Sequence, residues 1–90
     1  MKYFVIGYIL TDTNTLCEKD GVDTLEECKE AVDTIKLNIP KAHFYSTETD
    51  SEYPKGCYLY VADEVGSVFF NQHVTGSKHS GARPICRYDE

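Results

Sequence analysis

Apolar residues recur at helical spacing between Asp23 and Pro40. The stripe consists of Leu25, Cys28, Val32 and Ile35, and charged side chains occupy the other face. Asp23 or Thr24 can cap the first turn, and Glu27, three residues after Thr24, completes a capping box. Because a proline disfavours helical geometry in the residue before it, the helix is expected to end by about residue 38. The pattern predicts one amphipathic helix with a cysteine in its apolar stripe.

The other apolar segments are short, as is typical of strands. Residues 2–10 contain β-branched and aromatic side chains with little alternation, which favours one buried strand covered on both faces. Further strands are expected at residues 42–48, 56–62, 67–71 and 85–88. A long polar connection, expected to be a loop, runs from Gln72 to Pro84 before the last strand.

These elements predict a single α+β domain over residues 1–90. We expect one helix packed on an antiparallel sheet of about four to five strands. The apolar run at the start is too short to cross a bilayer, so no membrane insertion is expected. Polar residues follow this run where a signal peptide would need small residues at its cleavage site, so it is not expected to be a cleaved leader.

The four cysteines, Cys17, Cys28, Cys57 and Cys86, lie far apart in the chain. None belongs to a C-x-x-C pair, the spacing typical of structural zinc sites and redox motifs. A chain of this length buries only about 60–65% of its unfolded surface, so a small domain usually needs covalent reinforcement. Two disulfides in an oxidising compartment are therefore the favoured interpretation. Four buried thiols in a cytosolic protein are the alternative.

The chain is acidic, with 15 Asp and Glu against 9 Lys and Arg and a net charge of −6. A negative chain is repelled by the phosphates of nucleic acids and by anionic membranes. Nucleic acid is therefore not expected as a partner.

Three segments carry a resemblance to a known family. A capped helix with a cysteine, residues 23–31, precedes an aromatic strand, residues 43–46, and a cysteine strand, residues 56–60. Together they resemble the apple or PAN modules of extracellular proteins. In that family a helix packs across an antiparallel sheet, and the modules bind protein or glycan without catalytic residues. A further cysteine that commonly follows the helix cysteine in the family is missing here, as is its partner.

The resemblance implies a nested pair of disulfides. One would join the helix to a central strand, Cys28 with Cys57, and the other would join the two ends of the domain, Cys17 with Cys86. The stretches around Cys57 and Cys86 are also similar to uncharacterised cysteine modules of algal and protist proteins. That second likeness carries no known activity.

Tyrosines are the first candidate binding residues, since the chain has seven of them. Tyr58 and Tyr60 alternate with Cys57 along one strand, and Tyr45 is expected beside them on a neighbouring strand. If Cys57 meets the helix cysteine, this tyrosine face is turned to water or to a partner, where rigid amphipathic rings suit protein and sugar contacts. The alternative is that the face packs beneath a loop.

The segment from Gln72 to Pro84 is the second candidate. It holds His73, Lys78, His79 and Arg83, which could grip an anion or an acidic partner; the alternative is a solvated loop. The spacing of the two histidines matches no common metal-ligand geometry, and neither a metal nor a cofactor is expected.

The first functional hypothesis is a non-catalytic extracellular, secreted or virion-associated interaction module that binds protein or glycan. The alternatives are a structural cement or linker subunit of a larger assembly and an inhibitor of a secreted hydrolase. Enzyme activity is not expected, because the cysteines are committed to disulfides and no serine has the context of a nucleophile elbow.

Overall fold

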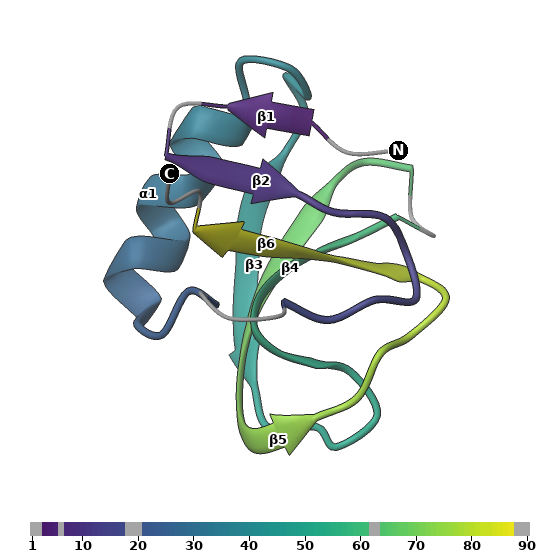
Figure 1. Ribbon diagram of the computed structural model, residues 1–90. Coiled ribbons are helices and arrows are strands. Elements are labelled where there is room, and N and C mark those ends of the chain that lie inside the picture. The colour runs from purple at the N-terminus through teal and green to yellow at the C-terminus, as the bar shows by residue number, and fades with distance from the viewer. Residues whose placement is uncertain (1–2, 6, 18–20, 62–63, 88–90) are drawn as a thin grey trace.

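The computed structural model describes residues 3–5, 7–17, 21–61 and 64–87. Its elements are, in chain order, β1 (Tyr3–Val5), β2 (Tyr8–Leu10), α1 (Leu25–Ile35), β3 (His43–Glu48), β4 (Pro54–Tyr60), β5 (Ser67–Gly76) and β6 (Ala82–Arg87). The strands form one sheet in the order β1-β2-β6-β4-β5-β3, with α1 against one of its faces (Figure 1). The expected α+β architecture, one helix packed on a sheet, is confirmed.

Most neighbouring strands of the sheet are antiparallel, as expected, but β3 and β5 are parallel. The chain passes from β3 to β4, leaving a gap of one strand, and β5 then returns into that gap. β4 runs opposite to β3, and β5, which pairs antiparallel with β4, therefore runs in the direction of β3. The insertion of β5 thus makes the sheet mixed.

The interpretation of residues 2–10 as one strand is wrong, because this segment is a hairpin of β1 and β2. Val5 pairs with Tyr8 and Tyr3 with Leu10 across a tight reversal. Gly7 sits in this reversal with a φ of +85°, a conformation that costs glycine little because it has no Cβ. The hairpin brings the described sheet to six strands.

The interpretation of residues 72–84 as a long loop is also wrong. β5 continues to Gly76, which pairs with Pro54, and β6 already begins at Ala82. The connection is therefore residues 77–81 alone. The sequence signal failed because the extension of β5 is mostly polar and exposed. Its one large apolar side chain, Val74, points to solvent, so no apolar alternation marks the strand.

The main core lies between α1 and the sheet. It consists of Leu10, Val22, Cys28, Ala31, Val32, Ile35, Ala42, Cys57, Leu59, Val68, Phe70 and Ile85. The backbone N–H of Glu27 donates to Oγ of Thr24 at 3.1 Å, so Thr24 is the N-cap of the helix. α1 ends at Ile35, before the limit set by Pro40.

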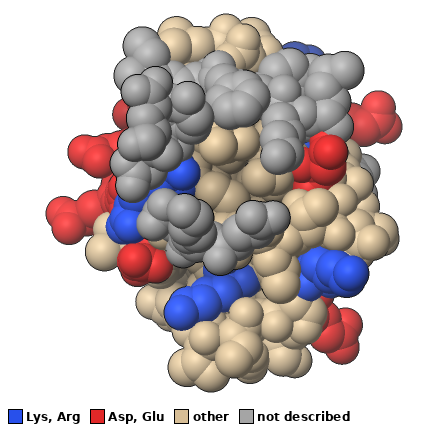
Figure 2. All heavy atoms as spheres, in the orientation of Figure 1, with Lys and Arg blue, Asp and Glu red and all other residues tan. Residues whose placement is uncertain are grey.

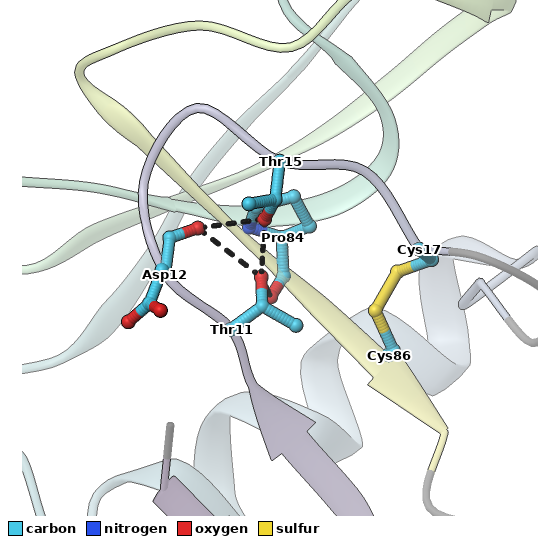
Figure 3. The surroundings of a disulfide bond; sticks show 6 residues. All are labelled: Thr11, Asp12, Thr15, Cys17, Pro84 and Cys86. Atoms are coloured by element: carbon cyan, nitrogen blue, oxygen red, sulfur yellow. Dashed lines mark hydrogen bonds between the residues drawn. A yellow bond between two sulfur atoms is a disulfide. The ribbon is translucent and has the colours of Figure 1, made fainter. Parts of the chain in front are cut away.

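The two disulfides, Cys28–Cys57 and Cys17–Cys86, lie on opposite faces of the sheet. Cys57 and Cys28 meet inside the core beneath the helix. Along β6, Ile85 belongs to that core, so its neighbour Cys86 points to the other face, where it meets the loop after β2 (Figure 3). Both pairings implied by the resemblance are present.

The loop that carries Cys17 is also tied to β6 by hydrogen bonds. Thr11 donates through its hydroxyl to the carbonyl oxygen of Pro84 at 2.8 Å (Figure 3). Thr15 donates to the carbonyl oxygen of Asp12, also at 2.8 Å, which closes the turn before the cysteine. The disulfide therefore joins two segments that are already ordered.

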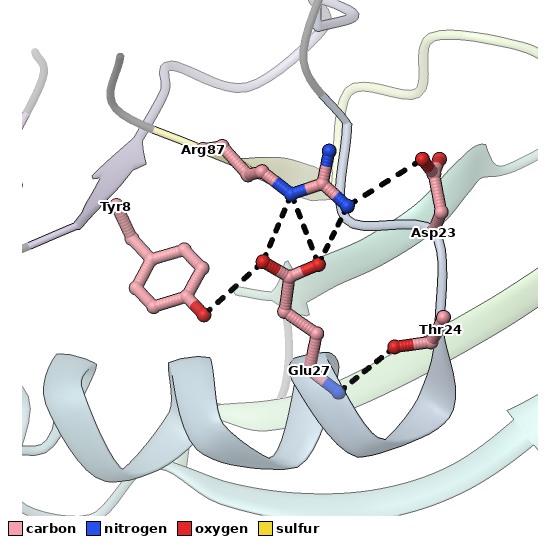
Figure 4. Close-up of polar contacts among 5 residues, drawn as sticks. All are labelled: Tyr8, Asp23, Thr24, Glu27 and Arg87. Atoms are coloured by element: carbon pink, nitrogen blue, oxygen red, sulfur yellow. Dashed lines mark hydrogen bonds and ion pairs between the residues drawn. The ribbon is translucent and has the colours of Figure 1, made fainter.

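A charged cluster joins the start of α1 to β6 and β2 (Figure 4). Nε of Arg87 donates to both carboxylate oxygens of Glu27, at 3.0 and 2.9 Å, and Nη2 donates to Oε1 at 2.7 Å. Asp23 lies 3.5 Å from the same guanidinium, and the Tyr8 hydroxyl donates to Glu27 at 3.4 Å. The expected capping box is thus only half present, because the Glu27 side chain is engaged by Arg87.

The outer face of α1 is acidic, since Glu26, Glu30 and Asp33 are exposed there. In the view of Figure 2, acidic side chains are visible on the side of the molecule where α1 lies and also on the opposite side. α1 is too short and too polar to span a bilayer, and the described residues contain no helix that could do so.

The two disulfides are expected to supply a large part of the folding stability. They close loops of 29 and 69 residues, and a crosslink across loops of this length contributes about 3.5–4.5 kcal/mol in the chain-entropy model, with the larger value for the longer loop. Replacing Cys17 and Cys86 by alanine should lower the free energy of unfolding by that amount in urea denaturation. An unchanged urea midpoint would contradict this expectation.

The ion pair of Glu27 with Arg87 is expected to make stability depend on pH. The hydrogen bonds from Arg87 lower the pKa of Glu27 from its ordinary value of 4.5. A lowered pKa adds stability above the unfolded value, and this is lost as pH falls through the folded value. Glu27→Gln should cost about 1 kcal/mol at neutral pH, measured by urea denaturation, and progressively less below about pH 4. Glu26→Gln, an exposed neighbour, is the control; a cost for Glu27→Gln that is the same at all pH values would contradict the prediction.

Candidate functional site

The face of the sheet opposite α1 carries a second layer of side chains, most of them aromatic. Along β4, Cys57 and Leu59 point into the main core, so Tyr58 and Tyr60 point the other way. Phe69 lies directly opposite Tyr58 on β5 and therefore shares its face. The predicted grouping of Tyr58 and Tyr60 on the face away from the helix cysteine is present.

Rings from five parts of the chain contact one another in sequence across this face. Phe69 stacks on Tyr58 with 5.5 Å between ring centroids, and Tyr58 stacks on Tyr53, also at 5.5 Å. Tyr53 in turn stacks on His79 at 4.2 Å. At the other end, Tyr45 of β3 lies 5.2 Å from Phe69. These five residues, Tyr45, Phe69, Tyr58, Tyr53 and His79, are named the aromatic row.

Tyr60 braces the aromatic row from the side. Its ring meets those of Phe69 and Tyr53 edge-on, each at 6.3 Å. Stacked and edge-to-face pairs of this kind add about 0.5–1.5 kcal/mol each beyond the area they bury. The aromatic row is thus a packed layer with fixed ring orientations.

The expectation that Tyr58 faces water or a partner is wrong, because its side chain is only 1% exposed. Its ring is covered by Phe69 on one side and Tyr53 on the other, and its hydroxyl donates to the carboxylate of Glu48. Burial raises the pKa of Tyr58 above its ordinary value, and the hydrogen bond to Glu48 raises it further. Tyr58 therefore stays protonated at the centre of the row, and neither face of its ring is free to contact a ligand.

Tyr45 is the open end of the aromatic row, with a side chain 65% exposed. The pairing of β3 with β5 slips between Phe44 and Ser46, so Tyr45 is an extra residue of the β-bulge type. A bulge re-aims the side chain of its extra residue, which accounts for a ring that contacts Phe69 yet remains exposed. The other outward residues of the layer, Tyr53, Tyr60, Phe69 and His79, are half-buried.

Asn71 fixes the loop that delivers Tyr53 to the row. Its side-chain amide donates to the carbonyl oxygens of Asp50, Tyr53 and Pro54 at 2.7, 3.0 and 3.0 Å. Its amide oxygen accepts from the backbone N–H of Asp50 at 2.9 Å and of His73 at 3.1 Å. The Asn71 side chain is 1% exposed, so it replaces water as the partner of these backbone groups.

Sequence reasoning missed Asn71, Tyr53 and Phe69. Asn71 ends an apolar run, a position that is equally typical of an exposed strand end. Tyr53 lies in a polar turn and Phe69 in an ordinary apolar strand. The pairing of β4 with β5 brings Phe69 to Tyr58, and the turn before β4 brings Tyr53 to the same face.

The predicted binding residues of the segment 72–84 have different partners. His73 accepts at Nδ1 from the backbone N–H of Gly76 at 2.9 Å, and His79 accepts in the same way from Gly81 at 2.9 Å. Arg83 donates from Nε to the carbonyl oxygen of Thr11 at 2.6 Å. His79 joins the aromatic row, and Lys78 beside it is exposed.

A hydroxyl and an imidazole meet where β3 and β5 begin. Oγ of Ser67 lies 3.3 Å from Nε2 of His43, whose Nδ1 lies 3.1 Å from the carbonyl oxygen of Lys41. Ser67 is 6% exposed, so a substrate has little access to its hydroxyl. This contact joins the two parallel strands β3 and β5.

Within the described residues, no group of three or more His, Cys, Asp and Glu side chains could hold a metal ion. The four cysteines are all oxidised in disulfides. With metal binding and thiol chemistry set aside for these residues, the aromatic row is the candidate binding surface, because it combines an exposed ring with fixed ring contacts.

Tyr58 is expected to ionise only when the protein unfolds. Its pKa is raised above the ordinary value of 10.0, so its contribution to stability is complete below about pH 10 and is lost as pH rises further. In an alkaline titration followed by tyrosinate absorbance, Tyr58→Phe should release one tyrosine proton fewer at the unfolding transition. The variant should leave the titration before unfolding unchanged; a loss of signal in that earlier phase would contradict the prediction.

The comparisons with known proteins give no match. No protein-family model fits this chain, and no curated protein or solved structure is significantly similar to it. The residues of the chain itself are therefore the evidence for its function.

Proposed function

We propose that this protein is a non-catalytic interaction module that binds a protein or a glycan through the aromatic row. The observation that carries the proposal is Tyr45, which is 65% exposed at the end of the aromatic row, with its ring tilted against that of Phe69. A ring held in this way loses little conformational freedom on binding, and tyrosine offers both an apolar face and a hydroxyl. Aromatic residues of this kind are enriched among the anchors of protein interfaces.

The state of the cysteines supports a binding role over a catalytic one. All four are joined in disulfides, so none is available as a thiolate nucleophile. Disulfides in a small domain are typical of oxidising surroundings. We place the protein outside the reducing cytosol, in a secreted or virion-associated setting.

The alternative of a cement subunit that donates its first strand to a neighbour receives less support. Ile9 of β2 pairs with Cys86 of β6, and Leu10 is 1% exposed in the main core. β2 is therefore an integral part of the sheet. A partner surface on a finished domain fits these contacts better than strand donation does.

Tyr45→Ala should weaken binding to any true ligand by about tenfold or more, because truncation of an aromatic residue that anchors an interface typically costs over 1 kcal/mol. Ligands would be selected with the wild-type protein on a glycan array and in a displayed peptide library. Leu37→Ala is the matched control, since Leu37 is 73% exposed just after α1 and outside the row. Ligands that bind Tyr45→Ala and Tyr60→Ala as tightly as wild type would contradict the proposal.

A further inference from the structure

The strand β3 forms one edge of the sheet. It stands last in the strand order, and β5 is its hydrogen-bonded neighbour within the described residues. The backbone N–H of His43 donates to the carbonyl oxygen of Gly66, on the side of β5, at 3.0 Å. Because successive residues of a strand turn their backbone groups to opposite sides, the N–H and carbonyl of Phe44 face outward. β3 therefore presents backbone donors and acceptors that no described strand pairs.

The residues of this edge favour pairing with a further strand. Proteins usually protect an edge with lysine, proline or an inward-pointing charge, because unpaired edges recruit other strands. Residues 43–47 contain no Lys, Pro, Asp or Glu, and Glu48 at the end of the strand accepts the hydrogen bond of Tyr58. The bulge at Tyr45 interrupts the edge at one residue, and the side chain it exposes is an aromatic ring. The opposite edge, β1, has only three residues.

The outward backbone groups define what can occupy this edge. Alternating N–H and carbonyl groups match the backbone of another extended peptide, and such strand addition is a common mode of peptide recognition. Side chains of adjacent strands approach to about 5 Å, so a residue of the added strand would meet the ring of Tyr45. A second copy of this chain is disfavoured, because each copy has a net charge of −6. The edge therefore fits a segment of a different protein.

We propose that the protein binds an extended segment of a partner protein, which adds to the outer edge of β3 as a further strand and places an aromatic or β-branched side chain against Tyr45. This inference rests on the proposed function and names the form of its ligand. Tyr45, 65% exposed and in contact with Phe69, supplies the side-chain contact. The backbone of β3 supplies the hydrogen bonds.

The first test uses peptides selected on the wild-type protein from a displayed library of random linear peptides. Each backbone N–H of a selected peptide is replaced in turn by an N-methyl group. Binding should weaken by at least about tenfold at every second residue, where the N–H faces β3, and should change little at the residues between them. A response without this alternation, or a library that yields no binding peptide, would overturn the inference.

Amide hydrogen exchange of the protein gives a second readout. The outward N–H of Phe44 should exchange at least about tenfold more slowly when a selected peptide saturates the protein, because the peptide backbone accepts its hydrogen bond. The N–H of His43 is already bonded to Gly66 and reports any general stabilisation by the ligand. Equal slowing at both amides would contradict strand addition at this edge.

Thr47→Lys places on β3 the kind of charge that protects natural edges. It should weaken the selected peptides by at least about threefold. Val74→Lys is the matched control, because Val74 is 78% exposed on β5, beyond the residues that pair with β3. If both variants have the same effect, the response reflects net charge and the inference is overturned.

Three further outcomes separate this inference from the proposed function. If only glycans are selected and they are sensitive to Tyr45→Ala, strand addition is refuted and the aromatic row stands as the binding surface. If peptides show the alternating N-methyl response but bind Tyr45→Ala and Tyr60→Ala as tightly as wild type, the edge stands and the aromatic row fails. If the protein alone sediments as a dimer that Thr47→Lys dissociates, the edge pairs with a second copy and the inference of a different partner fails.

Discussion

The disulfide between Cys28 and Cys57 sets the arrangement on which the rest of the molecule depends. It holds the first half of α1 against the central strand β4 and so decides which face of that strand belongs to the main core. Side chains alternate along a strand, and Tyr58 is therefore turned to the opposite face. One covalent contact thus separates the protein into an aliphatic layer beneath the helix and an aromatic layer on the other side of the sheet.

The aromatic layer covers a face of the sheet that a domain of this size has no second helix to cover. A domain of 90 residues has one helix to cover a sheet of six described strands, and the second face of β4 would otherwise expose Tyr58. Phe69 of the neighbouring strand and Tyr53 of the turn before β4 cover the ring of Tyr58, and His79 extends this layer, so that no second helix is needed. The carboxylate of Glu48 accepts the hydrogen bond of the buried Tyr58 hydroxyl. The second disulfide, Cys17–Cys86, reinforces the same face.

A buried polar residue links this packing to the proposed function. Asn71 makes five hydrogen bonds to backbone groups, and through them it holds the turn that carries both Tyr53 and the acidic side chains. A binding surface on a turn gains precision when the turn is fixed to a rigid strand. Through this turn, Asn71 holds Tyr53 against the rings of Tyr58 and His79.

The sequence by itself determined the elements whose signals are local. The helix follows from its apolar stripe and the Thr24 cap, and the opposite orientations of Cys57 and Tyr58 follow from strand alternation. The two disulfide pairings came from a family resemblance, since four cysteines alone allow three connectivities. The hairpin at Gly7 and the polar extension of β5 went unrecognised, because neither has a distinct pattern of alternation.

Only the tertiary structure decided what covers the tyrosine face. Alternation places Tyr58 on a face, but it says nothing about residues that reach that face from elsewhere in the chain. Phe69 arrives through strand pairing, Tyr53 through a turn held by Asn71, and Tyr45 through a slip in register. These contacts depend on the order of strands in the sheet, where β5 lies between β3 and β4. Exposure is a property of that whole arrangement, and for this reason the sequence identified the tyrosines and the structure decided which of them a partner can reach.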